Sequence, residues 1–339
     1  MHSSVEITYI DHERKSEIKA FLNEWDDDND FILAQTSGST GVPKSIELQK
    51  KHMIASAKKT LDFFQLKSGQ TAYLPLSTAT IAGKMMVVRA IVGKLKLIIG
   101  PISSDSLLHY DQKLDFTAVV PLQLEHALTN DSSRLHNIKN ILVGGAQLSD
   151  QLIKTVVFNK LCVFQSYGMT ETMSHVAIRK IDNSNNLIYY CLNDINLSIN
   201  SRSELIIHAP DLGIDALQTN DIVELHTSTS FTWLGRSDFV INSGGKKIFP
   251  ETVEKKLSNL IQVPYFIYGV PDDHLGTTVV LIIESAKKIM YSREDFESFL
   301  EKFELPKRII FIEQFARTTS HKIDRKTSYL RPHVAQTVL

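Results

Sequence analysis

Small hydroxyl residues, glycines and a lysine gather in the segment AQTSGSTGVPKS, residues 34–45, and could together bind a polyphosphate. Glycines let backbone N–H groups approach an anion, hydroxyls donate further hydrogen bonds, and Lys44 adds positive charge. A Walker loop is excluded, because the lysine comes one residue too late after Gly38 and Pro43 replaces the glycine before it. The alternative is an ordinary surface turn, which the same residue types favour. The residues expected to contact phosphate are Thr36, Ser37, Gly38, Ser39, Thr40, Gly41 and Lys44.

Further segments suited to nucleotide chemistry follow along the chain. QSYGMTE (165–171) offers an aromatic ring, a glycine for close approach, a hydroxyl and a carboxylate. GGAQL (144–148) supplies two glycines after an apolar run, and QTNDIV (218–223) supplies an acidic acceptor. GRSDFVINSGGKKIFPETVE (235–254) and SHKIDRK (320–326) add cations and a glycine turn. Taken singly, QSYGMTE could also be a strand followed by a polar turn. Residues 235–254 could be a glycine hairpin followed by an amphipathic helix, and the lysine in 320–326 could be a solvated surface charge.

The order and register of these segments resemble the motifs of the acyl-adenylate-forming superfamily. This superfamily contains acyl- and aryl-CoA ligases, luciferases and the adenylation domains of peptide synthetases. The resemblance extends over roughly residues 31–330, almost the whole chain. It implies an enzyme that uses ATP, Mg²⁺ and CoA, forms an acyl-adenylate, and has a mobile C-terminal domain.

The resemblance also implies roles for individual residues. Thr170, Glu171 and Lys322 match catalytic positions, with Glu171 assisting Mg²⁺, a cation that prefers oxygen ligands. Asp238 matches the hinge of the small domain, and the glycines at 244–245 match a loop beside the CoA channel. Besides the phosphate loop, the implied ATP- and AMP-binding residues are Gly144, Gly145, Ala146, Ser166, Tyr167, Gly168, Met169, Asp221 and Arg236, and the channel residues are Gly244 and Gly245.

The chain departs from the family pattern at three places. Asn220 replaces a usual glycine, but asparagine tolerates left-handed backbone angles. His321 replaces the glycine that usually precedes the catalytic lysine. Only about 35 residues precede the phosphate loop, so we expect most of the usual N-terminal subdomain to be missing. A shortened subdomain favours a compact acid over a long fatty chain.

An arginine on an apolar helix gives the best clue to the acid. Apolar residues recur every three or four positions across 81–92, and Arg89 falls on the same side. A buried arginine is costly unless it meets an anion. It could pair with an internal Asp or Glu, or it could bind a second carboxylate of the substrate, together with Lys84. The segment resembles the corresponding one in o-succinylbenzoate–CoA ligases of menaquinone biosynthesis, which have an arginine at this position.

The expected reaction is therefore o-succinylbenzoate + ATP + CoA to o-succinylbenzoyl-CoA, AMP and pyrophosphate. Another aryl- or acyl-CoA ligase is an alternative within the class. A stand-alone adenylation unit that loads a carrier protein is a second alternative, although no early pocket aspartate for an amino acid is evident. A non-catalytic relative is disfavoured, because Glu171 and Lys322 are both present.

Composition fits a soluble enzyme. The 339 residues are 43% hydrophobic and carry a formal net charge of -1, which gives no basic excess for nucleic acid. No apolar run approaches the ~18–20 residues needed to cross a bilayer. The N-terminus lacks the apolar core of a signal peptide, and the two cysteines suggest neither a disulfide framework nor a metal site. We expect a cytoplasmic protein that binds small molecules, with its oligomeric state open.

Short β-rich runs alternate with helical patterns through the first half of the chain, such as the helix expected at 50–64. This alternation predicts a large α/β domain with partly parallel sheets. Residues 204–234 read as a small β subdomain, and the last hundred residues mix helices and strands. We expect an N-terminal AMP-binding domain over 1–235 and a small mobile α+β lid domain over 236–339.

Overall fold

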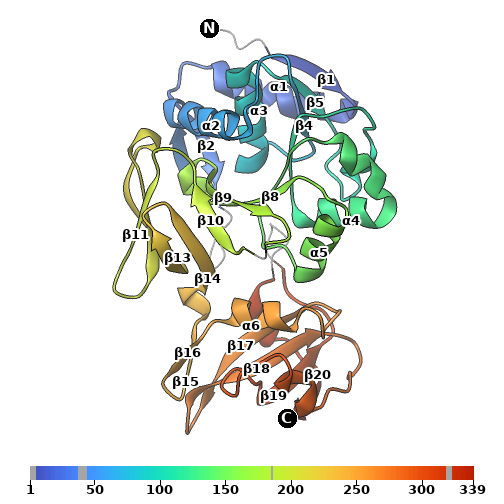
Figure 1. Cartoon of the computed structure of the whole chain (residues 1–339), viewed down its shortest axis with the longest axis vertical. Helices are drawn as coiled ribbons and strands as arrows, with labels where there is room; N and C mark the ends of the chain where they lie inside the picture. The colour runs from blue at the N-terminus through green and yellow to red at the C-terminus, as the bar shows by residue number, and fades with distance from the viewer. Residues whose placement is uncertain (1–4, 37–43, 185, 318–322) are drawn as a thin grey trace.

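The protein is described by a computed structural model over residues 5–36, 44–184, 186–317 and 323–339. Figure 1 shows a large part above and a smaller part below. In the described residues, one 12-stranded sheet and a two-stranded sheet belong to the large part, and a six-stranded sheet forms the smaller one. This mixed, partly parallel architecture confirms the predicted fold class. The boundary between residues 235 and 236 remains a proposal.

The strands alternate with helices until β8, and strands then predominate. The strands of the described residues are β1 (Glu6–Tyr9), β2 (Phe31–Gln35), β3 (Ser45–Gln49), β4 (Thr71–Leu74), β5 (Lys96–Ile99), β6 (Phe116–Val119), β7 (Ile141–Val143), β8 (Val163–Gly168), β9 (His175–Ile181), β10 (Ile188–Cys191), β11 (Asn196–Ile199), β12 (Glu204–Ala209), β13 (Ile214–Thr227), β14 (Ser230–Arg236), β15 (Ile241–Ser243), β16 (Lys246–Ile248), β17 (Tyr265–Asp272), β18 (Gly276–Glu284), β19 (Arg308–Ile312) and β20 (His333–Val338).

The longer helices lie in the large part. The α-helices of the described residues are α1 (Lys15–Asp26), α2 (Lys50–Phe64), α3 (Ile81–Gly93), α4 (Pro121–Asp131), α5 (Asp150–Phe158), α6 (Pro250–Leu257), α7 (Arg293–Glu297) and α8 (Arg325–Tyr329). The 3₁₀ turns are η1 (His12–Arg14), η2 (Ser106–Leu108), η3 (Ser132–Asn137), η4 (Thr170–Thr172), η5 (Pro210–Leu212) and η6 (Ser237–Phe239).

One half of the large sheet is parallel and covered on both faces. Its strands run in the order β1-β5-β4-β6-β7-β8. Side chains alternate between the faces, so Ala72 and Leu74 join a core with α1, α2 and α3, whereas Tyr73 joins a core with α4 and α5. Because helices cover both faces, these strands are apolar along almost their whole length.

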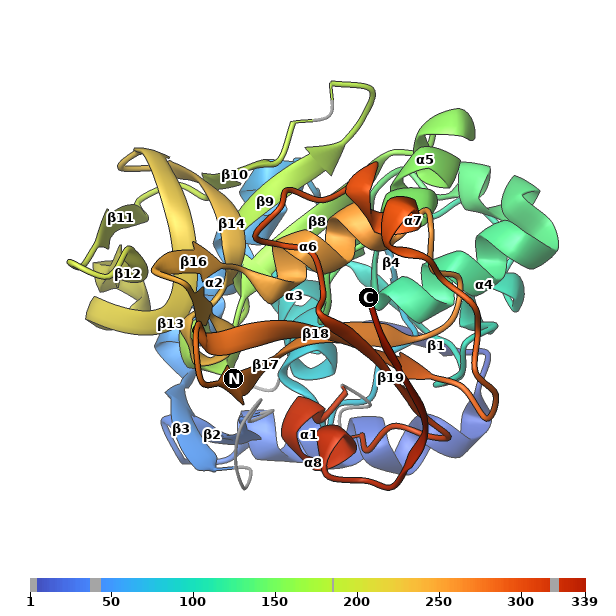
Figure 2. The same ribbon diagram turned by 90° about the horizontal axis from the view of Figure 1, so that it is seen from below.

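The other half of the large sheet is antiparallel. It continues from β8 through β9-β10-β14-β13-β12-β11, and the last four of these strands form the expected small β subdomain. The smaller part has the order β16-β15-β18-β19-β20, with β17 paired to β18. Helix α6 lies on the side of the smaller part that faces the large part (Figure 1), and Figure 2 shows the smaller part from below. The Thr252 hydroxyl of α6 donates to the Leu234 carbonyl at 2.9 Å, and Lys255 pairs with Asp150 at 3.7 Å.

Among the described strands, β2 pairs only with β3, and its side chains alternate between buried and more exposed. One local expectation is corrected. Helix α3 does not carry a single apolar stripe, since every residue from Gly83 to Ala90 is buried. Helix α2, in contrast, spans the expected range. Among the described residues we find no helix with the length and apolarity required to cross a membrane.

Candidate active site

The phosphate-loop segment joins the two strands of a hairpin. The backbone N–H of Thr36 donates to the Lys44 carbonyl at 2.8 Å, and the Lys44 N–H donates to the Thr36 hydroxyl at 3.1 Å. These bonds close the base of the loop between β2 and β3. The expected phosphate contacts Ser37, Gly38, Ser39, Thr40 and Gly41 lie outside the described residues.

The QSYGMTE segment ends β8 beside this loop. The Thr170 hydroxyl lies 3.5 Å from the Gln35 carbonyl at the end of β2. Gly168 must be glycine, because an added Cβ would lie 2.2 Å from the Ser174 carbonyl oxygen. Glu171 is half-buried, and no described residue hydrogen-bonds or pairs with its carboxylate. The end of β2 and the QSYGMTE segment therefore lie next to each other. Met169 joins Thr170 to the end of β8.

The glycines at 144–145 follow β7, the neighbour of β8. The Ser166 hydroxyl donates to the Val143 carbonyl at 3.0 Å. A Cβ on Gly144 would come within 2.9 Å of that hydroxyl, and Gly145 has a φ of +87°, which favours glycine. Gly144 thus lies against Ser166, and the Ala146 carbonyl accepts from the neighbouring Gln165 at 3.3 Å, so the two segments are adjacent.

The buried Tyr167 and Asp221 form a network with the partly exposed Arg236. The Tyr167 hydroxyl donates to Asp221 Oδ2 at 2.8 Å, and Trp233 Nε1 donates to Oδ1 at 2.9 Å. Burial, and then the Asp221 carboxylate, raises the pKa of Tyr167 well above its ordinary value, so the phenol stays protonated. Arg236 lies 3.9 Å from Asp221 and pairs with Asp238 at 2.7 Å. The expected ribose-binding and hinge residues are therefore directly connected.

Arg89 lies 2% exposed among neutral groups. Its Nε donates to the Thr60 hydroxyl at 3.1 Å, and its Nη2 donates to the Ser174 hydroxyl at 2.6 Å. His175 Nδ1 lies 3.5 Å from Nη2. No described residue accepts a hydrogen bond from Nη1, and no described carboxylate pairs with the guanidinium. Burial lowers the pKa of Arg89 to about 9, so it is still a cation at neutral pH.

The imidazole beside Arg89 carries no compensating charge. Burial, and then the Arg89 charge, holds the pKa of His175 well below its ordinary value. Its Nε2 lies 3.2 Å from the Thr60 hydroxyl. An internal ion pair, the structural alternative for Arg89, is thus not formed within the described residues. The arrangement offers a positive charge and one free N–H pair to an anion.

Lys84 has a different environment. Its Nζ pairs with Glu24 at 2.9 Å and lies 4.8 Å from the ring centre of Phe21. Glu24 therefore neutralises Lys84 without a substrate. The geometry leaves Arg89 as the better candidate for a substrate carboxylate.

The smaller part ties its last helix to α6. Arg325 pairs with Glu254 at 2.9 Å and lies 3.8 Å from Glu251. Burial is the main cause that raises the pKa of Glu251 to about 7. Lys322 precedes Arg325 by three positions and lies outside the described residues. Gly244 and Gly245, with φ of +55° and +80°, form the turn between β15 and β16.

The donor set fits a magnesium ion held with a nucleotide. The described residues contain no cluster of three or more His, Cys, Asp or Glu that could hold a metal alone. No described residue pairs with the Glu171 carboxylate, whose neighbour Thr170 lies at the end of β2, and Mg²⁺ commonly binds through one or two carboxylates plus substrate phosphates.

Four polar residues of the site were missed by sequence reasoning. Thr60 sits in the middle of α2, and Ser174 and His175 follow the QSYGMTE segment. Trp233 lies on β14 beside Asp221. The available signal was a histidine placed directly before the apolar residues 176–178, and its partner could not be inferred from spacing.

The described ends of the hydroxyl-rich segment, the aromatic–carboxylate end of β8 and the Asp221–Arg236 pair are the parts expected of a nucleotide-binding enzyme of the adenylating class. The chain belongs to the AMP-binding enzyme family, whose sequence profile matches residues 4–190. The family expected from the motifs is thereby confirmed.

Solved and curated relatives agree. The crystal structure of an acyl-CoA synthetase (AMP-forming)/AMP-acid ligase II-like protein from Dyadobacter fermentans is 32% identical, with a TM-score of 0.63 and 94% of each chain covered. The 2-succinylbenzoate–CoA ligase of Listeria monocytogenes is 24% identical over 91% of this chain and 72% of its own length. O-succinylbenzoate coenzyme A synthetase from Bacillus subtilis, in complex with ATP and magnesium ion, has a TM-score of 0.77 at 20% identity, covering 88% of this chain and 69% of that one. At that identity, the last likeness establishes the fold alone.

Proposed function

We propose that this protein is an AMP-forming ligase that joins o-succinylbenzoate to CoA. The observation that carries the choice of acid is Arg89, a buried cation without a carboxylate partner in the described residues. A dicarboxylic acid would use one carboxylate for adenylation and place the other on Arg89. The curated relatives named for 2-succinylbenzoate support the same choice.

In the first step, the substrate carboxylate attacks the α-phosphate of ATP, and pyrophosphate leaves. The carboxylate is ionised at neutral pH and needs no general base, so the site acts through positioning and charge stabilisation. Lys322 and Thr170 are the proposed contacts to the reacting groups. Mg²⁺, when bound, neutralises phosphate charge, and Glu171 would hold it.

The nucleoside would lie along the ends of β7, β8 and β14. The Tyr167 ring and the backbone of residues 144–146 would contact the adenine, and the Asp221 oxygens would accept hydrogen bonds from the ribose. Each Asp221 oxygen already accepts one bond and has capacity for a second. Arg236 lies next to both groups and is the proposed contact to the ribose and phosphate.

In the second step, the CoA thiol attacks the acyl carbon and AMP leaves. We propose that the smaller part rotates about Asp238 between the two steps, withdraws Lys322 and brings Gly244 and Gly245 beside the CoA channel. The Arg236–Asp238 pair, at 2.7 Å, lies at this pivot.

A pyrophosphate-release assay with and without CoA tests the function. We expect release with o-succinylbenzoate and Mg-ATP, and a thioester product only when CoA is added. The matched control acid is 4-oxo-4-phenylbutanoate, which lacks only the ring carboxylate. Activity on other aryl acids but not on o-succinylbenzoate would contradict the proposed substrate. Transfer to a carrier protein but not to CoA would contradict the proposed acceptor.

A further inference from the structure

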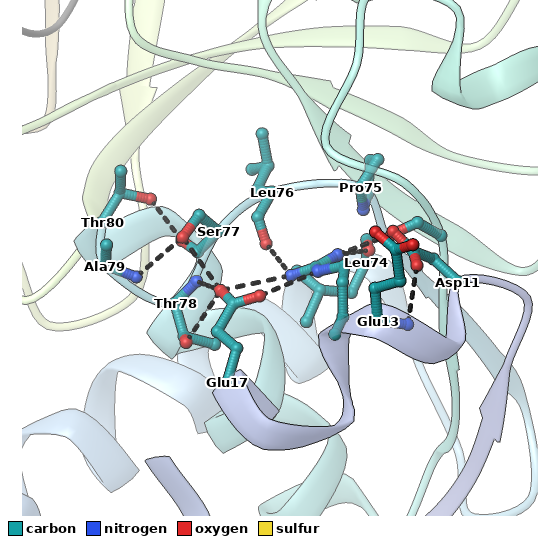
Figure 3. Close-up of polar contacts among 12 residues, drawn as sticks. Asp11, Glu13, Glu17, Leu74, Pro75, Leu76, Ser77, Thr78, Ala79 and Thr80 are labelled. Carbon is teal, nitrogen blue, oxygen red and sulfur yellow. Dashed lines mark hydrogen bonds and ion pairs between the residues drawn. The ribbon is translucent and has the colours of Figure 1, made fainter. Parts of the chain in front are cut away.

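The N-terminal helix α1 is bonded to the loop that begins α3. Glu17 Oε1 accepts hydrogen bonds from the Ser77 hydroxyl at 2.9 Å, the Thr78 N–H at 2.5 Å and the Thr78 hydroxyl at 3.0 Å. Figure 3 shows this carboxylate pointing into the turn formed by residues 77–80. One side chain therefore fixes three donors of a single short loop.

Arg14 holds Glu17 from the other side. Its Nε pairs with Glu17 Oε2 at 2.9 Å, and its terminal nitrogens donate to the carbonyls of Leu74 and Leu76, at and after the end of β4, and of Gly100 after β5. The guanidinium is itself 5% exposed. Glu17 is thus oriented by a buried, fully engaged cation.

The loop is in turn packed on the first turn of α3. The Thr80 hydroxyl caps the helix by accepting from the Gly83 N–H at 3.3 Å. A Cβ at Gly83 would lie 2.1 Å from the Ser77 carbonyl oxygen, so loop and helix are in direct contact. Four positions into the helix, Lys84 pairs with Glu24 of α1 at 2.9 Å. Helix α1 therefore holds α3 at two points.

Arg89 is carried by α3, but its partners belong to other elements. Thr60 lies on α2, and Ser174 precedes β9. Arg89 follows Thr80 by nine positions, roughly 13 Å along a helix axis. Because a helix moves nearly as a rigid rod, a shift at its anchored end displaces the guanidinium relative to these partners.

We propose that Glu17 is a positioning residue that sets the place of α3 and thereby aims Arg89 at the remote carboxylate of the acid. This inference rests on the proposed function. It also assigns a role to the short segment before the phosphate loop: α1 forms the support behind the acid site. Glu24 also restrains the position of α3, through its ion pair with Lys84.

The test compares Glu17→Gln with Asp27→Asn. The control removes an ion pair between the end of α1 and Lys50, at 2.8 Å, that touches neither the loop nor α3. The readout is the ratio of kcat/KM for o-succinylbenzoate to that for 4-oxo-4-phenylbutanoate. We expect Glu17→Gln to lower this ratio by about 10- to 100-fold, the scale for a displacement near 1 Å, mainly through KM. Asp27→Asn should leave it unchanged.

A second variant guards against a general folding defect. Ser77→Ala removes one donor to Glu17 and leaves the Arg14–Glu17 pair in place, so it should lower the ratio less, in the same direction. Equal loss of activity on both acids in Glu17→Gln, or an unchanged ratio, would overturn the positioning role. A wild-type enzyme that does not prefer the dicarboxylate would instead overturn the proposed substrate, which separates the two failures.

Discussion

Arg14 and Arg89 are both buried, at 5% and 2% exposed, yet their surroundings differ in one respect. Arg14 donates to three carbonyl oxygens and pairs with the carboxylate of Glu17. Arg89 meets two hydroxyls and a neutral imidazole. Burial alone therefore does not distinguish a structural arginine from a ligand-binding one. The presence or absence of a counter-charge does.

The difference predicts opposite responses when each arginine is replaced. A satisfied buried pair leaves orphaned partners when one member is removed. An uncompensated buried charge can be replaced by an apolar side chain at little cost, or with a gain.

The largest effect on stability is expected for Arg14→Met. It would remove the cationic partner of Glu17 and one donor to each of the carbonyls of Leu74, Leu76 and Gly100, and we expect a loss of about 3–5 kcal/mol of unfolding free energy. Urea denaturation followed by circular dichroism measures this. The control is Arg293→Met, which breaks an exposed pair with Glu297 and should cost less than about 1 kcal/mol. Equal losses in the two variants would contradict the structural role of Arg14.

Arg89→Met should affect catalysis and spare stability. We expect kcat/KM for o-succinylbenzoate to fall by the equivalent of about 2–5 kcal/mol, the range for truncating one partner of a buried charge pair. Activity on 4-oxo-4-phenylbutanoate should change little, and the melting temperature should stay or rise. A parallel loss on both acids together with a lower melting temperature would make Arg89 a second structural arginine.

Binding of the acid should also show that Arg89, and not Arg14, contacts the ligand. At about 100 times its Kd, o-succinylbenzoate should stabilise the folded protein by about 2.7 kcal/mol, measured as a thermal shift. At that same concentration of the acid, Arg89→Met should show a much smaller thermal shift than the wild type. We do not expect an Arg14 variant to be both more stable and less active. An equal shift in wild type and Arg89→Met would place the carboxylate elsewhere.

The smallest expected effect is the loss of stability at low pH. Burial acts to raise the pKa of Glu17, but hydrogen bonds from Arg14, Thr78 and Ser77 outweigh it and hold the pKa below the ordinary 4.5. The stabilisation is therefore present above pH 4.5 and is lost as the pH falls through the lower folded value. Denaturation between pH 6 and 3 should show the stability advantage of wild type over Glu17→Gln shrinking in acid. An advantage that grows in acid would contradict this.

Local chemistry made parts of the site predictable. The loop closed by Thr36 and Lys44, and the close approach at Gly168, depend on residue types within a few positions of each other. Helix α2 was predicted to its ends because its pattern is amphipathic and its exposed face is polar. The order of motifs along the chain then sufficed to indicate the family.

Long-range neighbours were not predictable in the same way. Arg89 meets Thr60 and Ser174, which lie 29 and 85 positions away. The stripe expected on α3 failed because α1, α2 and the sheet all pack around it, so periodicity no longer marks one side. That Lys84 is neutralised by Glu24 likewise depends on packing between α1 and α3.

The hydrogen bonds of Arg14 also limit when α1 can dock while the chain is being synthesised. Its carbonyl partners lie 60, 62 and 86 positions further along the chain. Until residues 74–100 have been synthesised, the Arg14 guanidinium lacks its carbonyl acceptors and has only the nearby Glu17 as a partner. Contacts that close such long loops form late, because the entropy of closure is lost before the bonds are gained. Helix α1 is thus made before the segments on which it docks, and it completes its contacts only after β4 and β5 have been synthesised.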